Sequence, residues 1–255
     1  MKKGATIIVK EGPRELARAG AEIFASAAEE SIRETGAFRV ALSGGSTPRP
    51  MYRLSAQAPF AGRINWEKTS LFWVDERFVP EGDGASNYGA AKRDFIDRVP
   101  IPRDHVHPMF QVGLTLDQAA QRYEELLRAL IPLNEEGFPT FDLVLLGLGK
   151  DGHTASLFPG HPALREERRL VVPVKGGDPD VERLTLTLPV INAARRIVFM
   201  VAGRDKAPVL RAIFEEGVGE LPAQRVAPRS GQLIWLLDQE AASLIPKEVL
   251  HGGKG

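Results

Sequence analysis

The chain has 255 residues and no cysteine. The lack of cysteine excludes disulfide bonds, a thiolate nucleophile and a zinc site ligated by thiolates. An excess of either charge is also missing, because 33 basic residues balance 33 acidic ones. No overall electrostatic field would therefore attract nucleic acid or an anionic membrane, and any anion must be bound by a local group of side chains.

Long apolar runs are absent as well. No segment approaches the roughly 18–20 apolar residues of a membrane-spanning helix, and the apolar stretch before Lys10 is too short for a signal peptide. We therefore expect a cytoplasmic protein that binds neither nucleic acid nor membranes. Because no repeat or clear linker is visible, residues 1–255 are expected to form a single α/β domain, with a disordered tail after about residue 246.

The apolar pattern predicts strands that alternate with helices. Strands are expected at residues 7–9, 38–42, 70–74, 143–146, 171–174, 183–188, 197–202, 225–227 and 233–237. Helices are expected at residues 13–32, 88–96 and 116–130, and Ser86 can cap the second of them. Residues 143–146 are all apolar, as in a strand buried in a parallel sheet, whereas 183–188 alternate like an exposed or edge strand. The sequence thus predicts an α/β fold with a mostly parallel central sheet flanked by helices and a small additional strand region.

Four of these strands end in clusters of polar residues. The clusters cover residues 43–47, 75–77, 150–153 and 204–206. In open parallel sheets, ligands bind outside the carboxyl ends of the strands. We therefore expect the four clusters to meet at one edge of the sheet and to form one site.

The first cluster, Ser43-Gly-Gly-Ser-Thr-Pro48, connects a strand to a helix. Thr47 is expected to cap that helix, and Pro48 to occupy its first position. The motif is neither a P-loop nor a dinucleotide-binding fingerprint, and taken alone it also fits an ordinary tight turn. The free backbone N–H groups of such a turn suit a phosphate. The candidate phosphate ligands are Ser43, Gly44, Gly45, Ser46 and Thr47.

Two cations strengthen the phosphate interpretation. Lys206 is expected in the first turn of a helix, where the dipole disfavours a positive charge unless an anion lies near. The alternative interpretation is that Lys206 is a solvated surface lysine without a ligand. Arg77 could bind phosphate as a bidentate fork or could pair with the acids before it. Asp75 is expected to orient Arg77 or to contact sugar hydroxyls.

His153 is the strongest catalytic candidate. It follows Gly152 and lies two positions after Asp151, at the exit of the buried strand 143–146. A histidine in this place can act as a general base near neutral pH. A metal site is the competing interpretation, since Asp151 with His153, and His105 with His107, each offer two ligands. Neither pair has the third ligand or the spacing of a known zinc motif, so we expect no metal and no other cofactor. The pair His105 and His107 is expected in a connecting strand.

At these residues the chain resembles the 6-phosphogluconolactonases, within the wider group that shares the glucosamine-6-phosphate isomerase/deaminase fold. The Asp-Gly-His-Thr-Ala-Ser-Leu-Phe-Pro-Gly stretch is highly specific, whereas Ser-Gly-Gly-Ser-Thr-Pro is shared by the wider group. The matching segments follow the family's order along most of the chain and are Ala41-Leu-Ser-Gly-Gly-Ser-Thr-Pro48, Phe72-Trp-Val-Asp-Glu-Arg-Phe-Val-Pro80, Ser86-Asn-Tyr88, Leu146-Gly-Leu-Gly-Lys-Asp-Gly-His-Thr-Ala-Ser-Leu-Phe-Pro-Gly160, Arg183-Leu-Thr-Leu-Thr187 and Gly203-x-x-Lys206.

The resemblance implies a modified Rossmann-like fold and hydrolysis of 6-phospho-D-glucono-1,5-lactone to 6-phosphogluconate, the second step of the oxidative pentose phosphate pathway. It implies that residues 43–47, Arg77 and Lys206 hold the 6-phosphate, and that Arg183 lines the substrate pocket. His153 would activate water, with Asp151 beside it. The protein is expected to act on this small phosphorylated lactone as a monomer or a small homo-oligomer.

Three alternatives remain open. The related deaminases carry a glutamate five residues after the histidine, and this chain has Phe158 there. That difference favours a one-step lactone hydrolysis over an amino-sugar isomerisation. An esterase of another phosphorylated sugar acid is the second alternative. A non-catalytic sugar-phosphate-sensing module is the third, but the sequence offers it neither a helix-turn-helix nor a basic face.

Overall fold

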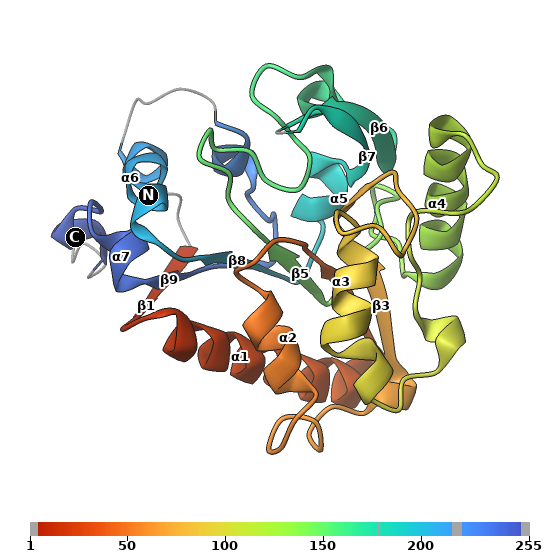
Figure 1. Ribbon diagram of the computed structural model, residues 1–255, viewed down its shortest axis with the longest axis horizontal. Helices are drawn as coiled ribbons and strands as arrows, with labels where there is room; N and C mark the ends of the chain where they lie inside the picture. The colour runs from red at the N-terminus through yellow and green to blue at the C-terminus, as the bar shows by residue number, and fades with distance from the viewer. Residues whose placement is uncertain (1–4, 178, 216–220, 251–255) are drawn as a thin grey trace.

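The computed structural model describes residues 5–177, 179–215 and 221–250. Its strands are β1 (Ala5–Lys10), β2 (Phe38–Leu42), β3 (Thr69–Trp73), β4 (Asp75–Arg77), β5 (Leu143–Leu146), β6 (Val171–Gly176), β7 (Val181–Leu186), β8 (Arg196–Val201) and β9 (Gln232–Asp238). Six of them form a parallel sheet in the order β1-β9-β8-β5-β2-β3 (Figure 1). The other three form an antiparallel sheet in the order β4-β7-β6. The predicted α/β fold, with a parallel central sheet and a small additional strand region, is confirmed.

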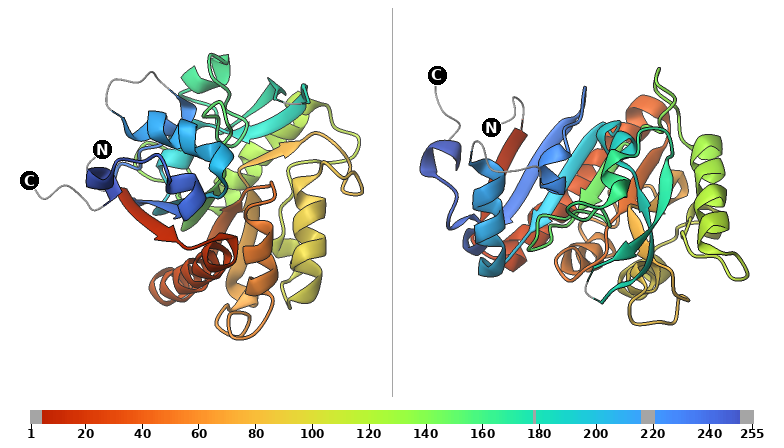
Figure 2. Two further views of the ribbon diagram at one scale, coloured as in Figure 1. Left: turned by 60° about the vertical axis from the view of Figure 1, so that its left-hand side comes forward. Right: turned by 90° about the horizontal axis from the view of Figure 1, so that it is seen from above.

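Helices lie on one face of the parallel sheet, and the small sheet lies on the other face together with a further helix. The helices are α1 (Pro13–Thr35), α2 (Arg49–Ser55), α3 (Asn87–Asp94), α4 (Leu116–Leu130), α5 (Leu188–Asn192), α6 (Ala207–Phe214), α7 (Gln239–Ala242) and α8 (Lys247–Leu250). Figures 1 and 2 show α1, α2 and α3 on one side, and β6, β7 and α5 on the other. The strand β5, between these layers, is buried at all four positions, as its apolar sequence predicts.

The boundaries of α1 follow from its sequence. Pro13 occupies the first position, where its missing N–H costs nothing, and Gly36 ends the helix with a φ of 80°. The Gly36 N–H donates to the Ile32 carbonyl. Phe24, on the apolar face, packs edge-on against Phe38 of β2 with a centroid distance of 5.4 Å. In the described part of the chain, no helix is long and apolar enough to cross a membrane.

The small sheet corrects one prediction from the sequence. Residues 183–188 alternate in polarity and were expected to form an exposed or edge strand. Instead, β7 is the central strand of the small sheet, and Arg183, Leu184, Thr185 and Leu186 are all buried. The reason is that β4 and β6 pair with its two sides while α4 packs against β6 and β7.

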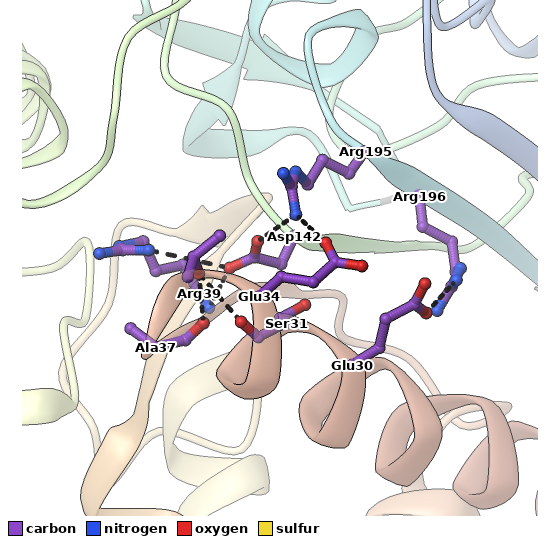
Figure 3. Close-up of polar contacts among 9 residues, drawn as sticks. Glu30, Ser31, Glu34, Ala37, Arg39, Asp142, Arg195 and Arg196 are labelled. Atoms are coloured by element: carbon purple, nitrogen blue, oxygen red, sulfur yellow. Dashed lines mark hydrogen bonds and ion pairs between the residues drawn. The ribbon is translucent and has the colours of Figure 1, made fainter.

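Charged residues tie α1 to the amino ends of the central strands (Figure 3). Asp142, directly before β5, is buried and accepts the backbone N–H of Arg39 at 2.8 Å. It also lies 3.9 Å from the Arg195 guanidinium, which pairs with Glu34 at 3.0 Å. Burial raises the pKa of Asp142, although these donors and charges oppose the rise. This network holds the edge of the sheet that lies opposite the polar clusters.

Three further predictions are wrong in detail. Residues 225–227 were expected to be a strand, but the chain forms the 3₁₀ turn Pro222–Arg225, in which the Gln224 N–H donates to the Leu221 carbonyl and the Val226 N–H donates to the Ala223 carbonyl. The connection expected to be a strand at His105 and His107 contains the 3₁₀ turn Arg103–His105 and an isolated bridge at Val106. The tail after residue 246 includes α8, where the Val249 and Leu250 N–H groups bond to the Pro246 carbonyl. Residues 251–255 lie outside the described part.

Candidate active site

The carboxyl ends of β2 and β5 form the centre of the candidate site. These strands are neighbours, and the chain continues from β2 toward one edge of the sheet and from β5 toward the other. Such a switch in strand order opens a crevice between the turns that follow, where open α/β sheets bind their ligands. The two turns contain the predicted clusters 43–47 and 150–153, which the structure therefore brings to one edge.

The turn after β5 holds His153 and Asp151 against each other. The Gly149 N–H donates to the His153 carbonyl at 2.8 Å, which closes the turn. Asp151 Oδ1 lies 2.6 Å from His153 Nδ1 and also accepts the His153 backbone N–H at 3.1 Å. A Cβ on residue 149 would lie 2.0 Å from His153 Nδ1, so this close pairing requires Gly149. The turn thus presents an imidazole oriented by a carboxylate.

This pairing influences the charge of Asp151. Partial burial raises the pKa of Asp151, but the hydrogen bonds and the charge of His153 outweigh that effect and hold the pKa below its usual value. Asp151 is therefore an anion at neutral pH. A carboxylate can only accept a hydrogen bond, so the Nδ1 atom of His153 is the donor in this pair. The carboxylate thereby fixes the orientation of the imidazole ring.

Phe158 and Arg183 form a wall beside His153. The rings of Phe158 and His153 are 4.9 Å apart, and the Arg183 guanidinium lies 5.6 Å from the Phe158 centroid. Arg183 is buried and donates from Nε to the Gly176 carbonyl at 2.9 Å. Burial and the charge of Arg77, its partner across β4 and β7, lower the pKa of Arg183. Arg183 therefore lies between Phe158, which packs on His153, and its cross-strand neighbour Arg77.

A pocket of about 160 Å³ lies between the turn after β2 and the start of α3. Two arginines and no acidic side chain belong to its lining in the described part of the chain. Its cations and backbone N–H groups therefore suit a small anion. The lining consists of Ser43, Gly44, Gly45, Ser46, Arg49, Tyr52, Arg77, Gly84, Ala85, Ser86, Asn87, Ala90 and Ala91.

Arg77 is held in this pocket by neutral groups. Its Nη1 donates to Asn87 Oδ1 at 2.7 Å and to the Ala85 carbonyl at 3.1 Å. The alternative for Arg77, a pairing of its side chain with the acids before it, is not among its side-chain contacts in the described part of the chain. Asp75 instead accepts the Ser156 hydroxyl at 2.7 Å, and its carbonyl accepts from Asn87 Nδ2 at 2.9 Å. Among the hydrogen bonds of the described residues, Asp75 is thus linked to the Arg77 side chain through Asn87.

Arg49 and Asn87 are pocket residues that the sequence reasoning missed. Arg49 is the first residue of α2, and its guanidinium forms two hydrogen bonds with Asp94, at 2.6 and 3.3 Å. Its place directly after the predicted phosphate turn was the available signal. Asn87 carried a weaker signal, as it belongs to the matched Ser86-Asn-Tyr88 segment, and its contacts depend on residues of β4. The predicted Ser86 cap is confirmed, because its hydroxyl accepts the Gly89 N–H at 3.0 Å.

Thr47 and Lys206 lie outside the pocket lining in the part of the chain that the structure describes. The expected cap at Thr47 is wrong: Pro48 takes the N-cap position, with helical backbone angles, and its carbonyl accepts the first helical bond, from Tyr52. Lys206 ends the 3₁₀ turn Arg204–Lys206 instead of lying inside the first turn of α6. Asp205 in that turn pairs with Lys150 at 3.3 Å, so the turns after β8 and β5 are in contact.

Of the second histidine pair, His105 and His107, the latter packs against core residues. His107 stacks on Phe72 of β3, with ring centroids 4.6 Å apart, and its carbonyl accepts the hydroxyl of Tyr123 at 3.0 Å. Across the described residues, no group of three or more histidine and carboxylate side chains is placed to hold a metal ion.

A larger cavity of about 900 Å³ lies at the other edge of the sheet, near the amino ends of β5, β8 and β9. Its arginines are largely neutralised by the acids around them. Arg195 pairs with Glu34, Arg196 pairs with Glu30 at 2.9 Å, and Arg229 pairs with Glu136. This cavity therefore lacks the uncompensated positive charge of the small pocket.

Comparison with known proteins places the chain in a family. Residues 11–235 match the family of glucosamine-6-phosphate isomerases/6-phosphogluconolactonase. A 6-phosphogluconolactonase of Synechocystis sp. is 45% identical over 215 residues, which cover 83% of this chain and 86% of the relative. The chain belongs to the 6-phosphogluconolactonase family. The resemblance stated from the motifs, and with it the class of enzyme, is confirmed.

Solved structures agree with the fold. The 6-phosphogluconolactonase of Trypanosoma brucei has a TM-score of 0.86 and 30% identity, over 95% of this chain and 99% of that one. A monomeric glucosamine-6-phosphate deaminase also has a TM-score of 0.78, at 22% identity over 94% of this chain and 99% of that one. The fold is therefore common to both branches, and only the site residues can distinguish between them.

Proposed function

We propose that this member of the 6-phosphogluconolactonase family hydrolyses 6-phospho-D-glucono-1,5-lactone to 6-phosphogluconate. The observation that carries the proposal is the combination of two features at one sheet edge. One is the His153–Asp151 pair, in which the carboxylate orients the imidazole. The other is the small pocket with Arg49 and Arg77, whose lining, among the described residues, contains no acid. Together they match a substrate with a phosphate at one end and an electrophilic carbonyl at the other.

In the proposed reaction, His153 Nε2 removes a proton from water as the water oxygen attacks C1 of the lactone. Asp151 accepts the Nδ1–H of His153 at 2.6 Å and stabilises the imidazolium that forms. The tetrahedral oxyanion then collapses, the bond from C1 to the ring oxygen breaks, and the imidazolium returns the proton to that oxygen. The products are a carboxylic acid, which ionises, and a hydroxyl group.

The backbone N–H groups of Gly149 and Gly152 are poor candidates to stabilise the oxyanion. The Gly149 and Gly152 N–H groups already donate to the carbonyls of His153 and Gly149, at 2.8 and 3.1 Å. A cationic side chain of the same edge is therefore the better candidate to stabilise the negative charge.

A covalent intermediate on Ser156 does not fit the geometry. The Ser156 hydroxyl is fully buried and donates to Asp75 Oδ2 at 2.7 Å. A serine nucleophile needs a base that removes its proton and an exposed oxygen that can reach the substrate. Direct attack by water is therefore the mechanism that these contacts favour.

Amino-sugar isomerisation is the alternative within the same fold. It would need an additional carboxylate five residues after His153, where this chain has Phe158. The Phe158 ring packs 4.9 Å from the imidazole, so an apolar surface occupies that side of the histidine. This replacement favours hydrolysis of a lactone. The cytoplasmic location and the monomeric or small oligomeric state remain predictions from the sequence.

The test compares two substrates on the purified protein. Freshly generated 6-phosphogluconolactone is followed by acid release, corrected for spontaneous hydrolysis, and glucosamine 6-phosphate is followed by ammonium release. We expect accelerated acid release and no ammonium. Ammonium release without accelerated acid release would refute the proposal and favour the deaminase alternative. Gluconolactone without phosphate, as a third substrate, is expected to react with a much lower kcat/KM.

A further inference from the structure

We propose that Asn87 is a positioning residue that holds Arg77 as an uncompensated cation at the small pocket and so sets the preference for phosphorylated lactones. The inference rests on the proposed function, because it specifies how the same site recognises the phosphate. Asn87 touches neither the reacting carbon nor the water in this account, and it acts through Arg77.

The orientation of the Asn87 amide is determined by its two partners. Its Nδ2 donates to the Asp75 carbonyl at 2.9 Å and more weakly to Asp75 Oδ1 at 3.5 Å, both of which can only accept. The amide oxygen must therefore face the other way, where it accepts from Arg77 Nη1 at 2.7 Å. The backbone is fixed as well, since the Asn87 N–H donates to Glu76 Oε1 at 2.7 Å. Asn87 is thus held from three sides, with one acceptor directed at the guanidinium.

Gly44 leaves the space for this arrangement. A Cβ at position 44 would lie 1.8 Å from Asn87 Oδ1 and 2.3 Å from its amide carbon, so no other residue is compatible with Asn87 in its place. Position 44 of the predicted phosphate turn therefore requires glycine for a steric reason, in addition to allowing a ligand to approach. It allows α3 to bring Asn87 between the turn and Arg77.

The neutrality of Asn87 is the important property. Among the described residues, the Arg77 guanidinium has two acceptors, Asn87 Oδ1 and the Ala85 carbonyl. Both are uncharged, so they orient the guanidinium without neutralising it. Arg49, the second arginine of the pocket, differs because it is paired with the carboxylate of Asp94. An aspartate at position 87 would retain the shape but neutralise Arg77 and place a second acid against Asp75. Attraction of a phosphate dianion would then be lost.

The experiment compares Asn87→Asp with Asn87→Ala. Asn87→Asp keeps the size of the side chain and adds a charge, whereas Asn87→Ala removes the acceptor and leaves the charge of Arg77. For 6-phosphogluconolactone, we expect Asn87→Asp to raise KM by roughly 10–100-fold, the usual worth of a hydrogen bond to a charged group. Asn87→Ala should raise it less, and kcat should change by less than about threefold in both. The kcat/KM for unphosphorylated gluconolactone should stay near that of the wild type. Gln57→Glu, an exposed change of the same charge, serves as the control.

A second readout does not depend on catalysis. Isothermal titration with inorganic phosphate and with 6-phosphogluconate measures the pocket directly, and weaker binding of both in the order wild type, Asn87→Ala, Asn87→Asp supports the inference. Equal loss for both lactones, or equal effects of the two substitutions, would overturn it. If the wild type bound the phosphates but hydrolysed no lactone, the proposed function would fail, and this titration would still decide the role of Asn87. Asn87→Ala keeps the test valid if Asn87→Asp does not fold.

Discussion

Glu76 allows a quantitative test of the electrostatics around the small pocket. Its side chain is buried, and its carboxylate accepts the backbone N–H groups of Arg77, Asn87 and Tyr88 at 2.7–2.9 Å. Burial raises the pKa of Glu76 to about 7, although these three donors favour the ionised form. In the folded protein, this carboxyl group therefore holds a proton at pH values where an unfolded glutamate, with a pKa of 4.5, has lost it.

The sign and size of the effect follow from this difference. Between pH 4.5 and about 7, the folded state binds more protons at this position than the unfolded state, so the free energy of unfolding falls as the pH rises. The contribution of Glu76 is fully present below 4.5 and is lost above about 7. A difference between 4.5 and about 7, at 1.36 kcal/mol for each pH unit, corresponds to a loss of about 3 kcal/mol.

Glu76→Gln isolates this contribution, because glutamine does not titrate and the other acids are common to both proteins. Urea unfolding of wild type and Glu76→Gln at several pH values between 4.5 and 8 measures the difference in free energy. We expect the wild type to lose up to about 3 kcal/mol relative to Glu76→Gln across this range. A difference that stays constant with pH, or that grows in favour of the wild type, would refute the reasoning.

Three further substitutions test other parts of the site and fold. Gly149→Ala places a Cβ 2.0 Å from His153 Nδ1, so kcat should fall at least about tenfold with little change in KM; unchanged kcat would contradict the pairing of His153 with Asp151. Arg77→Ala should raise KM for 6-phosphogluconolactone by roughly 10–100-fold and leave unphosphorylated gluconolactone nearly unaffected, and equal loss on both would show that the phosphate site is misplaced. Asp142→Ala leaves the Arg39 N–H without its acceptor at 2.8 Å, so urea unfolding should show a loss of about 1–3 kcal/mol. Its kcat should be unchanged, because it lies at the opposite edge, and a lowered kcat would show coupling across the sheet.

Much of the fold could be predicted because local patterns agree with the final packing. The bounds of β5 and α4, at residues 143–146 and 116–130, match the predicted ones. In β5, a short uninterrupted apolar run that ends at Gly147 indicates a buried strand, and in α4 the helical spacing of the apolar residues agrees with the face that the helix buries. The prediction for residues 183–188 was wrong, because the alternation of polar and apolar residues in a strand does not reveal that β4 and β6 pair with its two edges and that α4 packs against it.

The site was predicted unevenly for a related reason. His153 and Asp151 are two residues apart, so the chain itself places them together, and the glycine pattern shows it. Asn87 contacts Gly44 and Arg77, which lie on other elements, and its neutral amide gives no signal of its own. Arg49 follows the predicted turn directly, but only the folded structure shows that it lines the pocket. Contacts between distant segments, and the identity of the residue between two charges, could be seen only in the folded structure.

The most direct test of the proposed mechanism is the steady-state kinetics of His153→Ala on freshly generated 6-phosphogluconolactone. A general base contributes about 10²–10⁴-fold to the rate. If His153 activates the attacking water, kcat should fall by about this factor while KM stays nearly constant, because the phosphate pocket with Arg77 is intact. A kcat equal to that of the wild type would remove His153 from the chemistry and contradict the account.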